Sequence, residues 1–426
     1  MNSAYIVGAV RTPIGKFGGA LADFTAADMG VIAVRAALDR AFGELPAERT
    51  PVDKPDWSII PPFSRGAVAA RKTRYRVDEV IVGNARAAGV GPNVARQIAW
   101  RSGLGDDVPA FTINMACASG LRAVFLGWQQ ILLGDADLIV AAGTESMSRV
   151  PYFADTRWGF KMGHQPLVDG MYRDGLFCQI SRMIMGETAE VLARQYSIGR
   201  DEQDAYALES QQRAARAIKE CRFKEELVPM ERVDAKGRTT RLELDEHSRP
   251  DTSLESLKKL PPVFAKDGTI TAGNASGITD GAAAVVLVSE QKLRELKLTP
   301  LARIVSATVA AVDPRIMGVG PVPAIEKLEW RTGWKLADYD AIELNEAFAA
   351  QVLACDRELH FDRQRLNPNG GSIALGHPIG CTGARITATL VHELRRSAGQ
   401  AKPLRRGMAA LCVSGGLGVA MALETC

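Results

Sequence analysis

The sequence predicts an α/β fold in which helices cover a largely parallel β-sheet. Short runs rich in β-branched residues alternate with longer stretches of helical periodicity, as in consecutive βα units. The strand-like runs are apolar along their whole length, which indicates burial on both faces of a sheet. At 426 residues the chain is long enough for two or three domains or for one duplicated unit.

The individual elements follow from these two patterns. Strands are expected at 4–10, 78–84, 137–143, 282–289, 302–312, 341–347 and 408–414. Helices are expected between them, at 25–42, 91–102, 119–133, 201–221 and 382–396. The regularity fades over 148–276, and an insertion of that length usually forms a lid or a binding surface.

The two ends of the chain also resemble each other. In 117–143 a turn of small residues leads into a helix and then the strand DLIVAAG, and 376–414 repeats this order up to MAALCVS. Such repetition indicates a duplicated α/β unit with two equivalent layers. The expected division is an N-terminal half at 1–147 to which 277–297 returns, a loop domain at 148–276 and a C-terminal half at 298–426.

Composition disfavours several classes of function. The net charge of +3 is small for a nucleic-acid-binding protein. Seven cysteines without a CxxC pair or regular spacing disfavour a zinc site or disulfide framework and indicate reduced thiols. The N-terminus lacks the layout of a signal peptide, and no apolar run reaches membrane-spanning length. We therefore expect a cytoplasmic protein with no metal site, no nucleic-acid partner and no membrane span.

Cys117 is a candidate nucleophile because it stands where a strand-like run meets a helix. The stretch MACASGL places it among small residues, just before the helix expected from Ser119. Unsatisfied N–H groups and the helix dipole at such a position favour a thiolate. The alternative is a buried structural cysteine, since cysteine is among the residue types most often buried.

Three further residues occupy positions suited to chemistry. His377 alone among the five histidines lies between glycines at an expected helix start, where backbone and ligand can approach closely. Cys412 and Asn345 each end an apolar strand, the edge at which α/β proteins form their sites. Taken singly, each has a structural alternative: a turn histidine, a buried strand cysteine or a strand-end turn.

Taken together, these segments resemble the thiolase family, and the resemblance covers essentially the whole chain. It rests on VRTPIGKFGG, MACASGL, AAGTESMS, MGETAE, GTITAGNASGITDGAAA, ELNEAFAAQ, NGGSIALGHPIGCTGARI and LCVSGGLGVA. The resemblance implies the thiolase fold, with two homologous α/β halves in a layered αβαβα arrangement plus a loop domain. It also implies acyl transfer between coenzyme A thioesters by Claisen chemistry, with those thioesters as substrates and no further cofactor.

The resemblance implies a role for each candidate. Cys117 matches the nucleophile that becomes acylated, and His377 matches the base that takes its proton. Cys412 matches the thiol that removes a proton from the α-carbon of the incoming acyl-CoA. Asn345 matches the residue that holds a water and, with His377, stabilises the enolate. A second oxyanion site would use the backbone N–H groups of Cys117 and Ser414. Because one thiol stores the acyl group between two half-reactions, ping-pong kinetics are expected.

Two positions depart from the family's pattern. The usual Cys-x-Gly-Gly-Gly reads here Cys412-Val413-Ser414-Gly415-Gly416. We expect that Ser414 does not need a positive φ angle, which would strain a serine. Before MGETAE, Ile184 stands where many short-chain members have a histidine near the pantetheine arm. This second departure affects a polar contact to substrate and leaves the reactive groups in place.

The resemblance further implies a substrate channel and an assembly. The residues expected along the pantetheine arm and acyl slot are Ser276, Met185, Leu176, Phe264, Met317, Ala347 and Phe348. Arg249 and Ser256 match positions near the adenine end of coenzyme A. The stretch RWGFKMG at 157–163 resembles the tetramerisation loop of short-chain thiolases, so we expect a homotetramer built as a dimer of dimers.

The expected activity is that of an acetyl-CoA C-acetyltransferase, which joins two acetyl-CoA molecules to acetoacetyl-CoA and CoA or catalyses the reverse thiolysis. A 3-ketoacyl-CoA thiolase that acts on longer chains in fatty-acid β-oxidation is the alternative within the family. An alternative of another class is a non-catalytic, thiolase-like subunit that binds CoA. The presence of all four reactive positions disfavours that last alternative.

Overall fold

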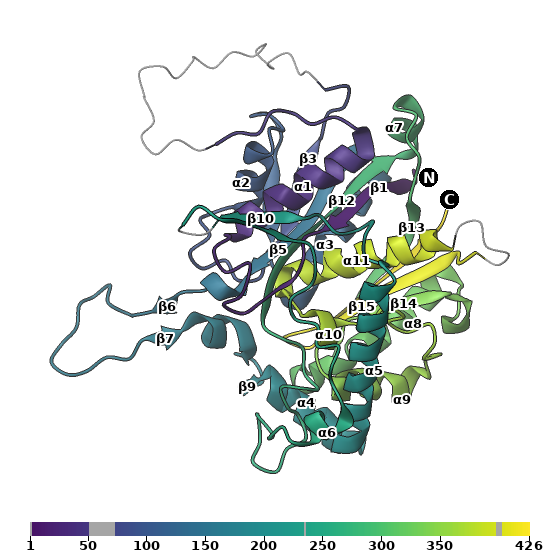
Figure 1. Cartoon of the computed structure of the whole chain (residues 1–426). Coiled ribbons are helices and arrows are strands. Elements are labelled where there is room, and N and C mark those ends of the chain that lie inside the picture. Colours follow the sequence, from purple (N-terminus) through teal and green to yellow (C-terminus); the bar gives the residue numbers. More distant parts are fainter. Residues whose placement is uncertain (1, 51–72, 234–235, 398–402) are drawn as a thin grey trace.

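Ten strands form one continuous sheet in the computed structural model, which describes residues 2–50, 73–233, 236–397 and 403–426 (Figure 1). In spatial order the strands are β14 (Ala341–Leu344), β15 (Arg406–Val413), β16 (Leu417–Glu424), β13 (Ala302–Ala311), β1 (Ala4–Arg11), β12 (Thr279–Ser289), β5 (Leu138–Ser146), β3 (Glu79–Gly83) and β4 (Ala110–Ile113). The short β2 (Gly15–Lys16) pairs with β12. Pairing of β1 with β13 joins two parts of the sheet. One part holds β1, β12, β5, β3 and β4, and the other holds β13, β16, β15 and β14.

The sheet is mixed, so the prediction of a largely parallel sheet is wrong. Strand β3 runs parallel to β4 and β5, and β14 runs parallel to β15, whereas β12 and β16 run antiparallel to both of their neighbours in the sheet order. Strand β16 returns directly after β15 in a hairpin, and β12 returns to the sheet from the long insertion. Both faces of these strands are buried whichever way they run, and therefore an apolar run does not reveal strand direction.

Helices cover both faces of the sheet and also fill the space between its two parts. The outer helices are α1 (Ala26–Phe42) and α2 (Val94–Arg101) on one side and α8 (Pro321–Thr332) and α9 (Ala349–Leu359) on the other. The middle layer is formed by α3 (Ser119–Leu133) and α11 (Ile379–Arg396), which pack on each other and on strands of both parts. The resulting order of layers is αβαβα, as the family resemblance implied.

Glycines allow α3 and α11 to approach closely. A Cβ atom added at Gly383 would lie 2.1 Å from the backbone nitrogen of Leu121, and one at Gly120 would lie 2.7 Å from the backbone nitrogen of Ala384. No side chain fits at such distances, so only glycine permits this contact. The contact brings the N-terminal ends of the two central helices together, and these ends follow two of the candidate residues, Cys117 and His377.

The segment 148–276 lies along one side of the molecule (Figure 1). Its helices are α4 (Met185–Gln195), α5 (Arg200–Lys219) and α6 (Leu254–Lys258). Its strand pairs are β6 (Tyr152–Phe153) with β7 (Val168–Asp169), β8 (Phe177–Cys178) with β9 (Met183–Ile184), and β10 (Met230–Val233) with β11 (Thr239–Leu242). The β6–β7 hairpin projects away from the body of the protein (Figure 1).

Short elements complete the described chain. They are the 3₁₀ turns η2 (Ala116–Ala118), η3 (Met147–Arg149), η5 (Pro314–Val319) and η6 (Leu336–Asp338), the π-helical turn η4 (Tyr172–Leu176), and the helices α7 (Glu290–Glu295) and α10 (Ser372–Leu375). Across the described ranges, no helix has both the length and the apolar character that crossing a membrane requires.

A buried ion-pair cluster ties β1 to the segment 148–276. Arg11 donates from Nε to Glu226 Oε1 at 2.5 Å and from Nη1 and Nη2 to the carboxylate of Asp245 at 2.6 and 2.9 Å. All three side chains are at most 1% exposed. Removing one partner of a buried pair is strongly destabilising because the charge left behind stays buried and unpaired.

Arg11→Met is therefore expected to lower the free energy of unfolding by about 3–5 kcal/mol. Urea denaturation followed by circular dichroism measures the change. The matched control is Arg315→Met, which breaks the exposed ion pair with Asp313 and is expected to leave the urea midpoint unchanged. A midpoint for Arg11→Met equal to that of the unmodified protein would contradict the assigned role of the cluster.

Candidate active site

The turn that carries Cys117 is held in an unusual backbone conformation. Ala116 has a φ angle of 43°, in the left-handed region that costs a non-glycine residue about 1–2 kcal/mol. The Asn114 side-chain oxygen accepts the N–H of Ala116 at 2.9 Å. Ser119 Oγ accepts the N–H of Met115 at 2.9 Å and donates to the carbonyl of Ala116 at 2.7 Å. These bonds fix the turn between β4 and α3, and the thiol lies at its apex.

The end of β15 brings the second cysteine to this turn. Strand β15 packs against η2, and the backbone N–H groups of Ser414 and of Cys117 itself lie near enough to the Cys117 thiol to lower its pKa. Positive φ angles occur here at Gly415 (90°) and Gly416 (84°) and not at Ser414. The expectation that Ser414 avoids this strain is thus confirmed, and its N–H is free to face the nucleophile.

Burial raises the pKa of both thiols. For Cys117 the withdrawal from water is the largest effect, and the Ser414 N–H and the charge of Arg86 act against it. For Cys412, which is fully buried, the next cause after burial is the nearby Cys117. The helix end was expected to lower the pKa of Cys117 and so favour its thiolate. Burial raises this pKa by more, so the thiol is the resting form. A base that accepts the proton is needed before the sulfur can attack.

His377 is oriented to act as that base. Its Nδ1 lies 2.6 Å from Thr382 Oγ1, and the same hydroxyl donates to the carbonyl of Pro378 at 2.9 Å. Because the hydroxyl proton goes to Pro378, Nδ1 must carry the hydrogen and Nε2 keeps its lone pair. Burial, reinforced by Arg385 and Arg86, lowers the pKa of His377 to about 3, so the ring is neutral at physiological pH.

Asn345 lies beside the free nitrogen of this histidine. It follows β14, is 1% exposed and places Nδ2 at 3.5 Å from His377 Nε2. Helix α11, which begins two residues after His377, packs against the η2 turn that carries Cys117. The four candidates Cys117, His377, Cys412 and Asn345, from distant parts of the chain, thus meet at one end of the sheet.

Two charged residues that sequence reasoning missed also lie here. Glu145 is fully buried and accepts the N–H groups of Ala85, Arg86 and Gly380 at 3.1, 3.0 and 2.7 Å. Arg86 donates to the carbonyls of Asp174 at 3.1 Å and Gly175 at 2.7 Å, in the turn η4. The sequence could have indicated Glu145, because this residue belongs to the motif AAGTESMS. Arg86 belongs to none of the motifs.

Arg86→Met is expected to move the pH profile of Cys117 alkylation by iodoacetamide to higher pH. The arginine charge lowers the Cys117 pKa, so its loss raises that pKa and reduces the thiolate fraction at a given pH. The rate is measured against pH by mass spectrometry of the Cys117 peptide. Arg96→Met is the control, because Arg96 also donates to backbone carbonyls but lies outside the site. A profile that stays in place would exclude this role for Arg86.

Most residues expected along the acyl slot lie against the two cysteines. Cys412 shares one apolar cluster with Met185, Met317, Ala347, Phe348 and Phe264. Leu176 packs in a second cluster with Cys117. The N–H of Ser276 donates to the carbonyl of Ala347 at 3.0 Å, and the next residue, Gly277, accepts the N–H of His377 at 3.3 Å. These side chains give the site apolar walls.

Arg249 and Ser256 lie apart from this cluster. Both are exposed. The Arg249 N–H donates to the Gln211 side chain on α5, and Ser256 caps α6 with Ser253. Ile184, the other departure from the family pattern, donates its backbone N–H to Glu187 at 2.8 Å and so begins α4. Within the described part of the chain, no group of three or more His, Cys, Asp or Glu side chains could hold a metal ion.

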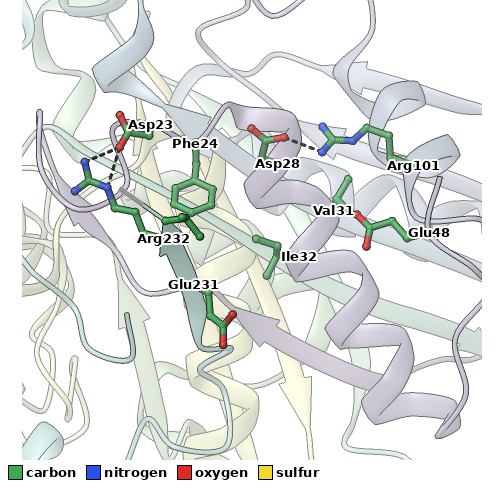
Figure 2. Close-up of a pocket in the computed structure, with 10 residues that line it drawn as sticks. Asp23, Phe24, Asp28, Val31, Ile32, Glu48, Arg101, Glu231 and Arg232 are labelled. Carbon is green, nitrogen blue, oxygen red and sulfur yellow. Dashed lines mark hydrogen bonds and ion pairs between the residues drawn. The ribbon is translucent and has the colours of Figure 1, made fainter. Parts of the chain in front are cut away.

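A surface pocket of about 380 Å³ lies elsewhere, between α1 and β10 (Figure 2). It is lined by Asp23, Phe24, Asp28, Val31, Ile32, Glu48, Arg101, Glu231, Arg232 and Val233. Two of its ion pairs, Asp23 with Arg232 and Asp28 with Arg101, neutralise much of its charge (Figure 2). None of the candidate catalytic or substrate-binding residues lines this pocket.

Family comparisons cover most of the sequence. The family described as "Thiolase, N-terminal domain" matches residues 64–291, and the family described as "Thiolase, C-terminal domain" matches residues 298–425. All four residues that meet at the end of the sheet fall within these ranges.

Similar proteins extend over the full length. A probable acetyl-CoA acetyltransferase of Escherichia coli (strain K12) is 46% identical over 426 residues, which are 100% of this chain and 99% of that protein. A probable acetyl-CoA acyltransferase of Staphylococcus aureus (strain COL) is 43% identical, over 99% and 98% of the two chains.

Solved structures agree with this similarity. The Bacillus anthracis acetyl-CoA acetyltransferase superposes with a TM-score of 0.89 at 43% identity, over 100% of this chain and 99% of that one. The human mitochondrial 3-ketoacyl-CoA thiolase in complex with CoA superposes with a TM-score of 0.87 at 41% identity, over 100% and 98%.

Proposed function

This chain belongs to the thiolase family, and from that premise we propose that it is an acetyl-CoA C-acetyltransferase. It joins two acetyl-CoA molecules to acetoacetyl-CoA and CoA, or cleaves acetoacetyl-CoA with CoA. The full-length relatives that carry this name support the proposal. The observation that carries it is the meeting of Cys117, Cys412 and the neutral His377 at one apolar site. A CoA-binding subunit without turnover would not need these groups together.

In the first half-reaction we assign Cys117 as nucleophile and His377 as base. His377 Nε2 takes the thiol proton, and the thiolate attacks the carbonyl carbon of acetyl-CoA. The N–H groups of Cys117 and Ser414 stabilise the oxyanion, which collapses to an acetyl thioester on Cys117. The departing CoA sulfur takes the proton back from His377. A neutral histidine suits this exchange because it can both accept and return the proton.

In the second half-reaction we assign Cys412 as the group that handles the α-proton. His377 takes the proton of the Cys412 thiol, and the Cys412 thiolate removes the α-proton from a second acetyl-CoA. The resulting carbanion attacks the thioester on Cys117, so that a new C–C bond forms and the C–S bond to Cys117 breaks. The released Cys117 thiolate takes the proton back from His377, and acetoacetyl-CoA leaves. A carbon acid is far weaker than a thiol, so the enolate needs donors aimed at its oxygen as it forms. Asn345 and His377 take this role through a water, and the steps need no cofactor beyond the CoA thioesters.

The bulky side chains around Cys412 favour a short acyl group. Phe264 and Phe348 stand edge to face, with ring centroids 6.2 Å apart, and Met317 and Met185 pack with them. A long-chain 3-ketoacyl-CoA would have to displace these rings. We therefore propose acetoacetyl-CoA as the preferred substrate for cleavage.

Spectrophotometry of ketoacyl-CoA loss in the presence of CoA tests both the activity and its chain length. A kcat/KM at least about tenfold higher for the C4 than for the C8 ketoacyl-CoA is expected. The reverse preference would favour the β-oxidation thiolase, and absence of turnover on either substrate would favour the CoA-binding subunit. In either of those cases the proposed activity is wrong.

We also propose that the enzyme is a homotetramer, a dimer of dimers, held in part by the β6–β7 hairpin. Trp158, Phe160, Met162 and Leu167 in this hairpin are 91%, 54%, 101% and 67% exposed, which is unusual for large apolar side chains. The double variant Trp158→Ser with Met162→Ser is expected to sediment as a dimer in analytical ultracentrifugation. A tetramer that persists in this variant, or a monomer for the unmodified protein, contradicts the assignment.

The remaining proposals concern organisation and compartment. We divide the chain into an N-terminal half at 1–147 joined by 277–297, a loop domain at 148–276 that contacts CoA through Arg249 and Ser256, and a C-terminal half at 298–426. We assign the enzyme to the cytoplasm, because all seven cysteines are free thiols and reducing compartments maintain that state.

A further inference from the structure

A buried chain of polar side chains leads from α11 to Asn345. Arg385 donates from Nη2 to Ser372 Oγ at 2.8 Å, and Ser372 Oγ donates to Asn345 Oδ1 at 2.6 Å. All three residues are at most 1% exposed. Because bulk water does not compete with these bonds, they determine how the Asn345 amide is oriented.

The guanidinium sets the direction of each bond in this chain. Arginine can only donate, so Ser372 Oγ accepts from Arg385 and keeps a single proton to give to Asn345. Only the oxygen of the Asn345 amide can accept that proton, which turns Nδ2 toward His377 Nε2, 3.5 Å away. The reversed amide would leave the Ser372 proton without an acceptor and would set the amide oxygen against the lone pair of Nε2.

Two further residues, one on strand β14 and one on helix α11, contact Arg385 and His377. Glu343 on β14, two residues before Asn345, forms an ion pair with Arg385 at 3.8 Å. Thr382, three residues before Arg385 on α11, fixes the tautomer of His377. One face of α11 thus orients both groups of the enolate site, Asn345 through Ser372 and His377 directly.

We propose that Ser372 and Arg385 are positioning residues of the reaction, which hold the Asn345 amide with its N–H groups toward the acyl slot. The proposal rests on the proposed function, in which Asn345 and His377 stabilise the enolate. It predicts that the hydrogen bonds from Arg385 to Ser372 and from Ser372 to Asn345 matter for making or breaking the C–C bond and not for acyl transfer to Cys117. These two activities can be measured separately on the full-length enzyme.

The test compares two reactions of Ser372→Ala. Thiolysis of acetoacetyl-CoA passes through the enolate and is expected to lose about 10–100-fold in kcat, less than the full loss of an oxyanion donor. Exchange of isotopically labelled CoA into acetyl-CoA needs only acyl transfer and is expected to stay within about twofold, as is the KM of thiolysis. Ser372→Thr keeps the hydroxyl and is expected to restore thiolysis.

A matched control separates positioning from loss of packing. Ser102→Ala deletes the same atom from a serine that is equally buried and whose hydroxyl has no hydrogen-bond partner in the described structure. This variant is expected to keep both activities. If Ser372→Ala does not fold, Ser372→Cys keeps a side chain of similar size but donates weakly, and its thiolysis is expected to fall in the same way.

A double-mutant cycle decides whether Ser372 acts through Asn345. In an Asn345→Ala background, adding Ser372→Ala is expected to cause no further loss of thiolysis, because the group that it positions is already gone. Losses that multiply, a thiolysis rate unaffected by Ser372→Ala, or an equal loss of the exchange reaction would each overturn the proposal. Failure of the proposed function is recognised separately from the unmodified enzyme, which would then turn over neither ketoacyl-CoA or would prefer the C8 to the C4 substrate.

Discussion

Cys117→Ala is expected to reduce both the thiolysis of acetoacetyl-CoA and the exchange of CoA into acetyl-CoA by at least about a thousandfold. In the proposed mechanism both reactions pass through a thioester on this sulfur. Cys412 does not replace it, because the N–H groups of Cys117 and Ser414 that stabilise the oxyanion lie beside the Cys117 sulfur. Steady-state kinetics measures the first loss, and incorporation of labelled CoA measures the second.

Cys221→Ala is the matched control for this prediction. Cys221 is a free, exposed cysteine outside the site, and its replacement is expected to leave both rates unchanged. Acetylated protein supplies a second readout: mass spectrometry after incubation with acetyl-CoA is expected to find the acetyl group on the Cys117 peptide. Turnover that survives Cys117→Ala, or an acetyl group on another cysteine, would overturn the assignment of the nucleophile.

Residue type and position in the pattern were sufficient to select four candidate residues, whose catalytic roles remain proposals. Cys117 and His377 lie at turns of small residues before helices, and Cys412 and Asn345 follow apolar strands. Such positions are visible in a sequence because local patterning sets them. The structure places these residues together, at the strand ends where α/β proteins form their sites.

Strand direction and long-range polar contacts are not visible in the same way. Strands β12 and β16 are buried on both faces along almost their whole length, so their antiparallel return leaves no mark in the hydrophobic pattern. Ser372 and Arg385 lie 27 and 40 residues from Asn345 in sequence, and only folding brings them into one hydrogen-bonded chain. Their residue types alone indicate a solvated surface.

The pKa of Cys117 shows a further limit of local patterning. The helix end and the small neighbours predicted a stabilised thiolate, whereas the structure half-buries Cys117, and withdrawal from water raises the pKa of its thiol. The cost of removing a charge from water depends on everything packed around it, including Arg86 and the apolar residues Leu176 and Met147. The sequence around Cys117 contains none of these residues.

Cys412→Ser is expected to separate the two half-reactions. Thiolysis of acetoacetyl-CoA is expected to fall by about 10²–10⁴-fold, the usual contribution of a positioned proton-transfer group, because an alcohol exchanges a proton with carbon far less readily than a thiol. Exchange of CoA into acetyl-CoA is expected to persist, since acyl transfer uses only Cys117, His377 and the backbone donors. Serine is nearly isosteric with cysteine, so the packing around β15 is retained.

Cys355→Ser provides the matched control, because Cys355 is likewise fully buried and near Cys412 but lies on α9. Its sulfur donates to the carbonyl of Gly318 at 3.3 Å, a bond that serine can also make. Both activities are expected to survive this change.

If Cys412→Ser lost exchange and thiolysis to the same degree, the two thiols would not divide the chemistry as proposed. If it lost neither, the α-proton would be handled by a different group, and His377 would be the next residue to test.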